Sequence, residues 1–122
     1  MSKNVLERYQ SVINGDLSAQ LISPVTNIKY LDNLLIELVC TGSPNGTFYV
    51  EFSADYNQDL NQNTLNPGTW VPLDFGTQTP TITAATDIML DLNQMPAPYV
   101  RVRWVPVSGT GVLNMWITAK GI

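Results

Sequence analysis

With 122 residues, the chain is long enough for one domain with a single hydrophobic core and needs no disulfide staples. Its formal charge is −4, only 13% of its residues are charged, and none is histidine. This composition disfavours nucleic acid as a partner, because neutralising phosphates requires clustered Lys and Arg. It also removes the commonest general base and the imidazole ligands of zinc sites.

The first 16 residues have two open interpretations. Val5, Leu6 and Tyr9 recur at a nearly helical spacing, although a helix of this length is marginal on its own. An extended arm that becomes ordered on a partner suits the segment equally well. We therefore divide the chain into residues 1–16, an N-terminal arm or short helix, and residues 17–122, one β-domain. Neither a secretory signal nor an apolar run long enough to span a membrane is recognised, so we expect synthesis in the cytoplasm and no membrane partner.

The β-domain alternates between turn signals rich in Gly, Pro, Asn and Asp and short runs rich in Val, Ile, Thr and aromatic residues. This spacing is typical of an antiparallel β-sandwich, either a jelly roll or an immunoglobulin-like fold, with about seven or eight strands. The strands that we expect cover residues 17–22, 34–40, 47–56, 69–75, 87–92, 99–107 and 112–120.

Two of the turns are expected to close hairpins. One joins strands 34–40 and 47–56, and the glycine-rich turn 108–111 joins strands 99–107 and 112–120. Pro72 lacks a backbone N–H, which predicts that its strand lies at a sheet edge. Alternate residues of the last two strands are predicted to enter the core, namely Val100, Val102, Trp104, Leu113, Met115 and Ile117.

Two carboxylates, Glu37 and Glu51, lie on consecutive predicted strands. Such a pair serves glycoside hydrolysis when it faces a common cleft, but the plainer interpretation is that both point outward and keep the sheet soluble. The single cysteine, Cys40, stands in an apolar run and is expected to be a buried thiol. We therefore expect a protein that is not an enzyme and uses no cofactor.

The loop around Tyr56 raises the question of a calcium site. Asp55, Asn57 and Asp59 alternate as ligands do in an EF-hand loop. However, Leu60 and Asn66 occupy the positions where such a loop needs glycine and a bidentate glutamate. Two interpretations stay open: a weak calcium site of another geometry, or a solvated loop built from side-chain-to-backbone turns.

Three outward-facing residues are candidates for a protein interface. Arg101 and Arg103 share one strand face, where they either pair with neighbouring-strand residues such as Glu, Asp, Thr or Asn or contact a partner subunit. Trp116 lies opposite the core stripe and suits an interface anchor or a platform for sugar stacking. With Val5, Leu6 and Tyr9 of the N-terminal segment, these residues make up the predicted interaction surface.

Three stretches, "GTFYVEFSADY", "GTWVPLDF" and "DLNQMPAPYVRVRWVPVSGTGVLNMWITAKGI", resemble the small β-sandwich structural proteins of tailed bacteriophages, a group that includes capsid decoration or cement proteins. The resemblance lies in the order of strands and turns from Thr41 to Ile122 and carries over no site residues. It implies a virion component, made in the bacterial host cytoplasm, that forms homo-oligomers and contacts other virion proteins such as the major capsid protein. The alternative function is a carbohydrate-binding β-sandwich that attaches a phage tail or its particle to the host surface.

Overall fold

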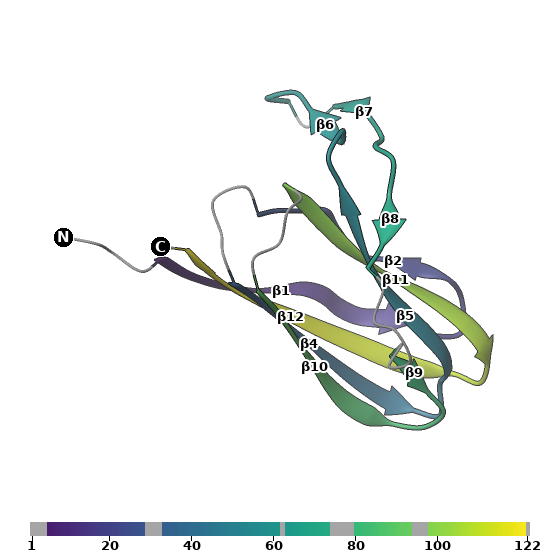
Figure 1. Ribbon diagram of the computed structural model, residues 1–122. Coiled ribbons are helices and arrows are strands. Elements are labelled where there is room, and N and C mark those ends of the chain that lie inside the picture. The colour runs from purple at the N-terminus through teal and green to yellow at the C-terminus, as the bar shows by residue number, and fades with distance from the viewer. Residues whose placement is uncertain (1–4, 29–32, 62, 74–79, 94–97, 122) are drawn as a thin grey trace.

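The computed structural model describes residues 5–28, 33–61, 63–73, 80–93 and 98–121. These residues form twelve strands and no helix, arranged as two packed sheets and a two-stranded extension (Figure 1). The predicted antiparallel all-β sandwich is thus confirmed. The expected strand number, seven or eight, is too low because several ladders are only two or three residues long. Over the described residues, no helix is long and apolar enough to cross a membrane.

The first sheet, called sheet A, has the strand order β1–β12–β4–β10, and each neighbouring pair is antiparallel. Its strands are β1 (Val5–Asp16), β12 (Gly111–Gly121), β4 (Asn33–Gly42) and β10 (Thr86–Asn93). The largely apolar strand β4 lies in the interior of the sheet, while β1 and β10 form the two edges.

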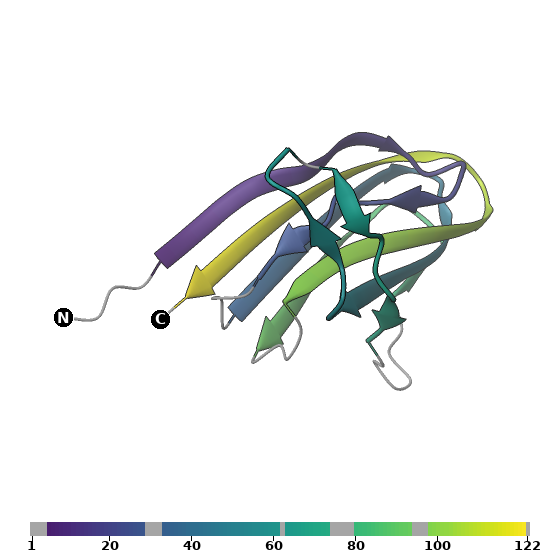
Figure 2. The ribbon, with the colours of Figure 1, turned by 90° about the horizontal axis from the view of Figure 1, so that it is seen from above.

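The second sheet, called sheet B, is built around the antiparallel pair β11 (Tyr99–Ser108) and β5 (Asn45–Ser53). Its shorter strands are β2 (Leu21–Ile22), β3 (Thr26–Asn27), β8 (Val71–Pro72) and β9 (Thr81–Ile82). Pro72 lies on the outermost strand of the path β2–β11–β5–β8, which confirms the predicted edge position. Figure 2 shows sheets A and B as two layers of one sandwich.

The β6–β7 extension, residues 54–70, projects beyond the sandwich (Figure 1). It contains β6 (Asn57–Gln58) and β7 (Thr64–Asn66), which pair only with each other among the described strands. The chain leaves β5 into this extension and returns through β8 to the edge of the same strand, so the extension is anchored on sheet B at both ends.

Of the two interpretations of the N-terminal segment, the helix is wrong, since residues 5–16 form the long edge strand β1. The ladder with β12 contains two register shifts, between Gln10 and Val12 and between Val12 and Gly15. Each shift inserts extra residues into the strand and breaks its two-residue period. The nearly helical spacing of the apolar residues in this segment therefore belongs to an irregular strand.

Both predicted hairpins are also wrong, because each turn crosses from one sheet to the other. Strand β4 belongs to sheet A and β5 to sheet B, while β11 belongs to sheet B and β12 to sheet A. The two crossing turns pack against each other, and the Ser43 N–H donates to the Thr110 carbonyl at 2.8 Å. Gly109 has φ of 83°, and a Cβ there would collide with the Ser43 carbonyl, so its glycine serves this close approach.

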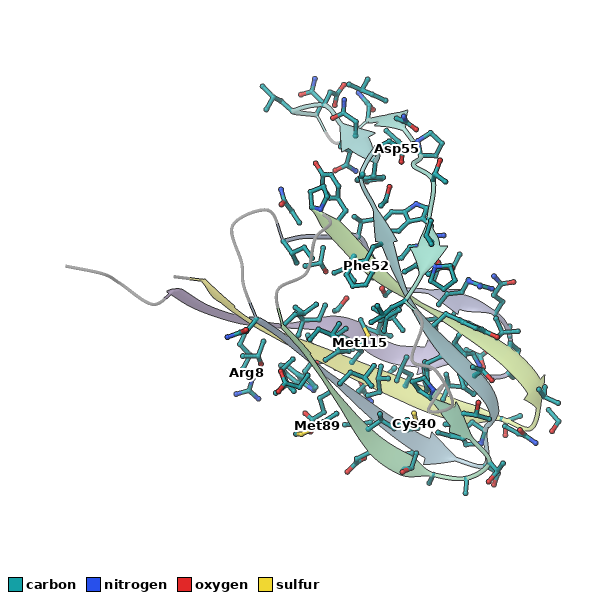
Figure 3. All side chains as sticks on the ribbon, viewed as in Figure 1. Arg8, Cys40, Phe52, Asp55, Met89 and Met115 are labelled. Atoms are coloured by element: carbon teal, nitrogen blue, oxygen red, sulfur yellow. The ribbon has the colours of Figure 1, made fainter. Side chains whose placement is uncertain are left out.

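The core lies between the sheets and contains the predicted stripe. All six residues of that stripe are buried: Val100, Val102, Trp104, Leu113, Met115 and Ile117. The Trp104 ring lies 4.6 Å from the Phe48 ring, and its Nε1 donates to the Leu17 carbonyl at 2.9 Å. Figure 3 shows Met115 and Cys40 between the sheets. Cys40 is a free, buried thiol, as its apolar sequence context predicts.

Candidate functional site

The outer face of sheet B carries a buried carboxylate held between two arginines. Glu51 of β5 is only 4% exposed although its strand face points away from the core. Nε of Arg101 donates to its Oε1 at 2.9 Å, and Nε of Arg103 donates to its Oε2 at 3.0 Å. Arg101 is the ladder partner of Glu51, whereas Arg103 reaches it along the diagonal. Charge-assisted bonds from both sides compensate the desolvation of this carboxylate.

Aromatic rings cover the two guanidinium groups. The guanidinium of Arg101 lies 4.3 Å from the centre of the Trp70 ring, and that of Arg103 lies 4.7 Å from the Tyr49 ring. Trp70 stands where the β6–β7 extension returns to the sheet, and its Nε1 donates to the Pro67 carbonyl. Trp70 therefore covers Arg101, one of the two arginines of the ion pair, while Glu51 itself lies between its ladder partners Arg101 and Pro72.

These contacts show the pairing with a neighbouring strand that was one of the two sequence interpretations of the arginines. Both Nε atoms bond to an acidic residue of the neighbouring strand, and the arginine side chains retain 21% and 27% of their exposure. The second carboxylate of the hypothetical acid pair, Glu37, lies on β4 of the other sheet. Glu37 and Glu51 thus do not share a face, and the arrangement does not bring them together for hydrolysis.

The loop predicted as a possible calcium site uses its carboxylates in two separate turns. Asp55 accepts from the Thr69 N–H at 2.7 Å and from the Ser53 hydroxyl at 2.9 Å, which lowers the pKa of Asp55. Asp59 accepts from the backbone N–H groups of Asn63 and Asn61, and these bonds lower the pKa of Asp59. Asn57 lies in β6 between them.

Both acceptors therefore tie the extension together as side-chain-to-backbone turns do. Asp55 joins the two ends of the extension, because Thr69 follows it by fourteen residues. Within the described part of the chain, no group of three or more Cys, Asp or Glu side chains is arranged to hold a metal ion.

The outer face of sheet A presents a broad, partly apolar surface. Trp116 is half-buried there, and the Arg8 guanidinium lies 5.1 Å from the centre of its ring. Leu35 and Val39 of β4 are half-buried on the same face, and Met89 of the edge strand β10 is 64% exposed. Figure 3 shows Arg8 and Met89 outside the sandwich.

Charge is distributed unevenly across this face. One row of ladder partners runs Arg8, Thr118, Leu35, Asp91 from edge to edge, so a cation and an anion stand at opposite ends. The adjacent row runs Gln10, Trp116, Glu37, Met89. Donor side chains therefore lie on β1 and β12, and carboxylates lie on β4 and β10.

Sequence reasoning identified Trp116 on this face but missed Arg8 and Asp91. Their relation depends on the strand order of sheet A, which local patterns do not contain. The backbone of the other three interface candidates belongs to β1: Val5 pairs with Gly121, Leu6 with Lys120 and Tyr9 with Ile117.

Neither a protein-family model nor a curated protein sequence matches the chain. The solved structures that resemble it in fold include two that align with nearly all of this chain. The SPBc2 prophage-derived protein YomS aligns with a TM-score of 0.55 and 8% identity over 99% of this chain and 97% of YomS. A chain from the structure of infectious bursal disease virus, Gx strain, aligns with a TM-score of 0.50 and 13% identity over 98% of this chain.

The two likenesses differ in extent. This chain spans nearly the full length of YomS but only 32% of the viral chain. At such low identities the comparison shows a shared fold, one that occurs both in a prophage-derived protein and in a virus.

Proposed function

We propose that the chain is a structural protein of a bacteriophage or prophage particle, made in the bacterial cytoplasm, which acts by binding protein and not by catalysis. The observation that carries this proposal is the alignment with YomS, which extends over almost all of both chains. More specifically, we propose a capsid decoration protein whose copies contact one another and the major capsid protein. The outer face of sheet A is the surface assigned to these contacts.

The residues of this face suit a protein interface. Trp116 is a large amphipathic side chain flanked by the half-buried Leu35 and Val39, and Arg8 stacks on it. Tryptophan and arginine are the residue types that most often dominate interface energetics. Four strands about 4.8 Å apart and about ten residues long cover roughly 650 Å² per copy, or about 1,300 Å² for a pair of copies. That area lies at the lower end of stable protein interfaces, about 1,200–2,000 Å².

The charge pattern favours a second copy of the chain as one occupant. A twofold axis parallel to the strands, passing between β12 and β4, would reverse the strand order and preserve each row. Arg8 of one copy would then meet Asp91 of the other, and the Trp116 indole N–H would face a Glu37 carboxylate. Self-complementarity of this kind is what an isologous interface requires.

Charge reversal tests the self-association. Arg8→Glu and Asp91→Arg should each weaken a dimer at least tenfold in sedimentation equilibrium, and the double variant should restore the affinity. Asn61→Arg, an exposed position in the β6–β7 extension, serves as the control and should leave the association unchanged. An intact protein that stays monomeric at millimolar concentration would refute the twofold pairing.

The particle role has its own test. Particles produced by the cells that encode the protein are purified by density gradient, separated into heads and tails, and probed by immunoblot. A decoration protein should band with the heads in a fixed ratio to the major capsid protein. Recovery only at the top of the gradient, away from every particle fraction, would contradict the proposal.

A further inference from the structure

A cavity of about 480 Å³ lies where the β6–β7 extension meets sheet B. Three segments far apart in the sequence line it: Pro24, Val25 and Asn27 around β3, Tyr56, Gln58 and Asp59 at the base of the extension, and Tyr99 at the start of β11. The volume falls within the range of small-molecule sites, about 300–1,000 Å³. This cavity is separate from the outer face of sheet A.

The aromatic wall is fixed by its own packing. Tyr56 and Tyr99 meet edge to face, with ring centroids 5.1 Å apart and planes 71° apart. Tyr56 also packs on Trp70, at 5.8 Å, and Trp70 in turn covers Arg101. The Tyr56 N–H donates to the Ser53 hydroxyl at 3.1 Å, which anchors the base of the extension on β5. The tyrosines thus belong to a preformed surface that connects with the Glu51 ion pair.

The residue types around the cavity select a ligand that is both polar and apolar. Two tyrosines, Pro24 and Val25 supply ring faces and aliphatic surface, while Asn27 and Gln58 bring carboxamides to the same wall. A neutral sugar ring has this character, because its C–H groups pack on aromatic rings and its hydroxyls exchange hydrogen bonds with amides and phenols.

The charges argue against ionic ligands. Among the described residues that line the cavity none is Lys or Arg, so they offer an anionic ligand no cationic partner, and the Asp59 carboxylate would repel it. A quaternary ammonium ion favours several ring faces around it. Here the edge of one tyrosine covers the face of the other, and the Asp59 oxygens already accept N–H groups of Asn61 and Asn63.

We propose that this cavity binds one or a few residues of a neutral saccharide. The inference does not depend on the particle role proposed above. The carbohydrate-binding hypothesis from the sequence placed the sugar on Trp116, which lies on sheet A. The cavity is a different site, beside sheet B, and it does not require calcium.

The test is titration of the intact protein with neutral oligosaccharides of the malto, cello, chito and β-galactoside series, followed by calorimetry and tryptophan fluorescence. A bound sugar beside Tyr56 should alter the emission of Trp70, which contacts that ring. Tyr56→Ala and Val25→Trp should each reduce the affinity at least tenfold. Val25→Trp is the sharper variant, because it fills the cavity and leaves both tyrosines in place, and thermal unfolding verifies that each variant is folded.

Val107→Ala, an exposed position outside the cavity lining and outside the outer face of sheet A, is the matched control and should leave the affinity within about twofold. If the intact protein binds none of the neutral oligosaccharides in either measurement, the proposal is overturned. Binding only of sialylated or phosphorylated glycans, or only of choline, would overturn its ligand class. Binding that survives Val25→Trp but is lost in Trp116→Ala would overturn its location.

Discussion

Replacing Glu51 by glutamine removes the negative charge that two arginines contact while it preserves the size of the side chain. Hydrogen bonds to charged groups contribute about 1.5–3 kcal/mol each, and loss of one partner from a buried ion pair costs about 3–5 kcal/mol. Here the arginine side chains keep 21% and 27% of their exposure, and glutamine still offers one oxygen. We therefore expect Glu51→Gln to lower the free energy of unfolding by about 2–3 kcal/mol. For a chain of this size the melting temperature should fall by about 6–12 °C.

Urea unfolding followed by circular dichroism and by tryptophan fluorescence measures this loss. The matched control is Asp87→Asn, which neutralises an exposed carboxylate on β10 and should change the stability by less than about 0.5 kcal/mol. The triple variant Glu51→Leu, Arg101→Met, Arg103→Met replaces the whole ion pair by apolar residues and should recover much of the loss. If Glu51→Gln costs no more than Asp87→Asn, the two arginines do not depend on Glu51 and the reasoning fails.

Two further predictions concern the core and a crossing turn. Burial raises the pKa of the Cys40 thiol to about 11, and the nearby charge of Asp87 adds to the shift. The unfolded chain releases this proton near its ordinary pKa of about 8.5, so stability should fall by about 2–3 kcal/mol as the pH rises from 8.5 to 11. Cys40→Val should lose less over that range in urea titrations, and equal slopes would contradict the assignment. Gly109→Ala should cost at least about 2 kcal/mol in thermal unfolding, because of its φ of 83° and the collision with Ser43, whereas Val107→Ala beside it should cost little.

The sequence predicts the long strands of the sandwich other than β1 well because their faces have different environments. The alternation in β11 and β12 identifies the buried stripe, and Pro72 identifies an edge. The sequence does not predict the connections between the sheets. A glycine-containing turn has the same sequence pattern whether it closes a hairpin or joins one sheet to the other. Gly46, which suggested a hairpin turn, lies inside β5, where a side chain would collide with the Trp104 ring.

The functional surfaces were predictable only where the residue pattern of a single strand determines them. Pairing of Arg101 with an acidic residue, Thr or Asn of a neighbouring strand was one of the two alternatives, and the register makes Glu51 its partner. The stacking of Trp70 on Arg101 was not predictable, since it depends on the path by which the extension returns to the sheet. The cavity was likewise invisible, because its lining residues come from three segments that only the tertiary fold brings together.

The two proposed surfaces lie on different sheets, and this arrangement has a consequence for assembly. Sheet A and sheet B form opposite layers of the sandwich, as Figure 2 shows, so a twofold contact through sheet A would leave both extensions and both cavities facing outward. Two weak saccharide sites held on one rigid dimer bind a polymeric glycan more tightly than either site alone, provided that the glycan spans both. Many copies fixed on a particle surface multiply this effect. A protein that binds its own copies through one sheet and neutral sugars through the other would therefore need only modest affinity at each cavity to retain a particle at a glycan-covered surface.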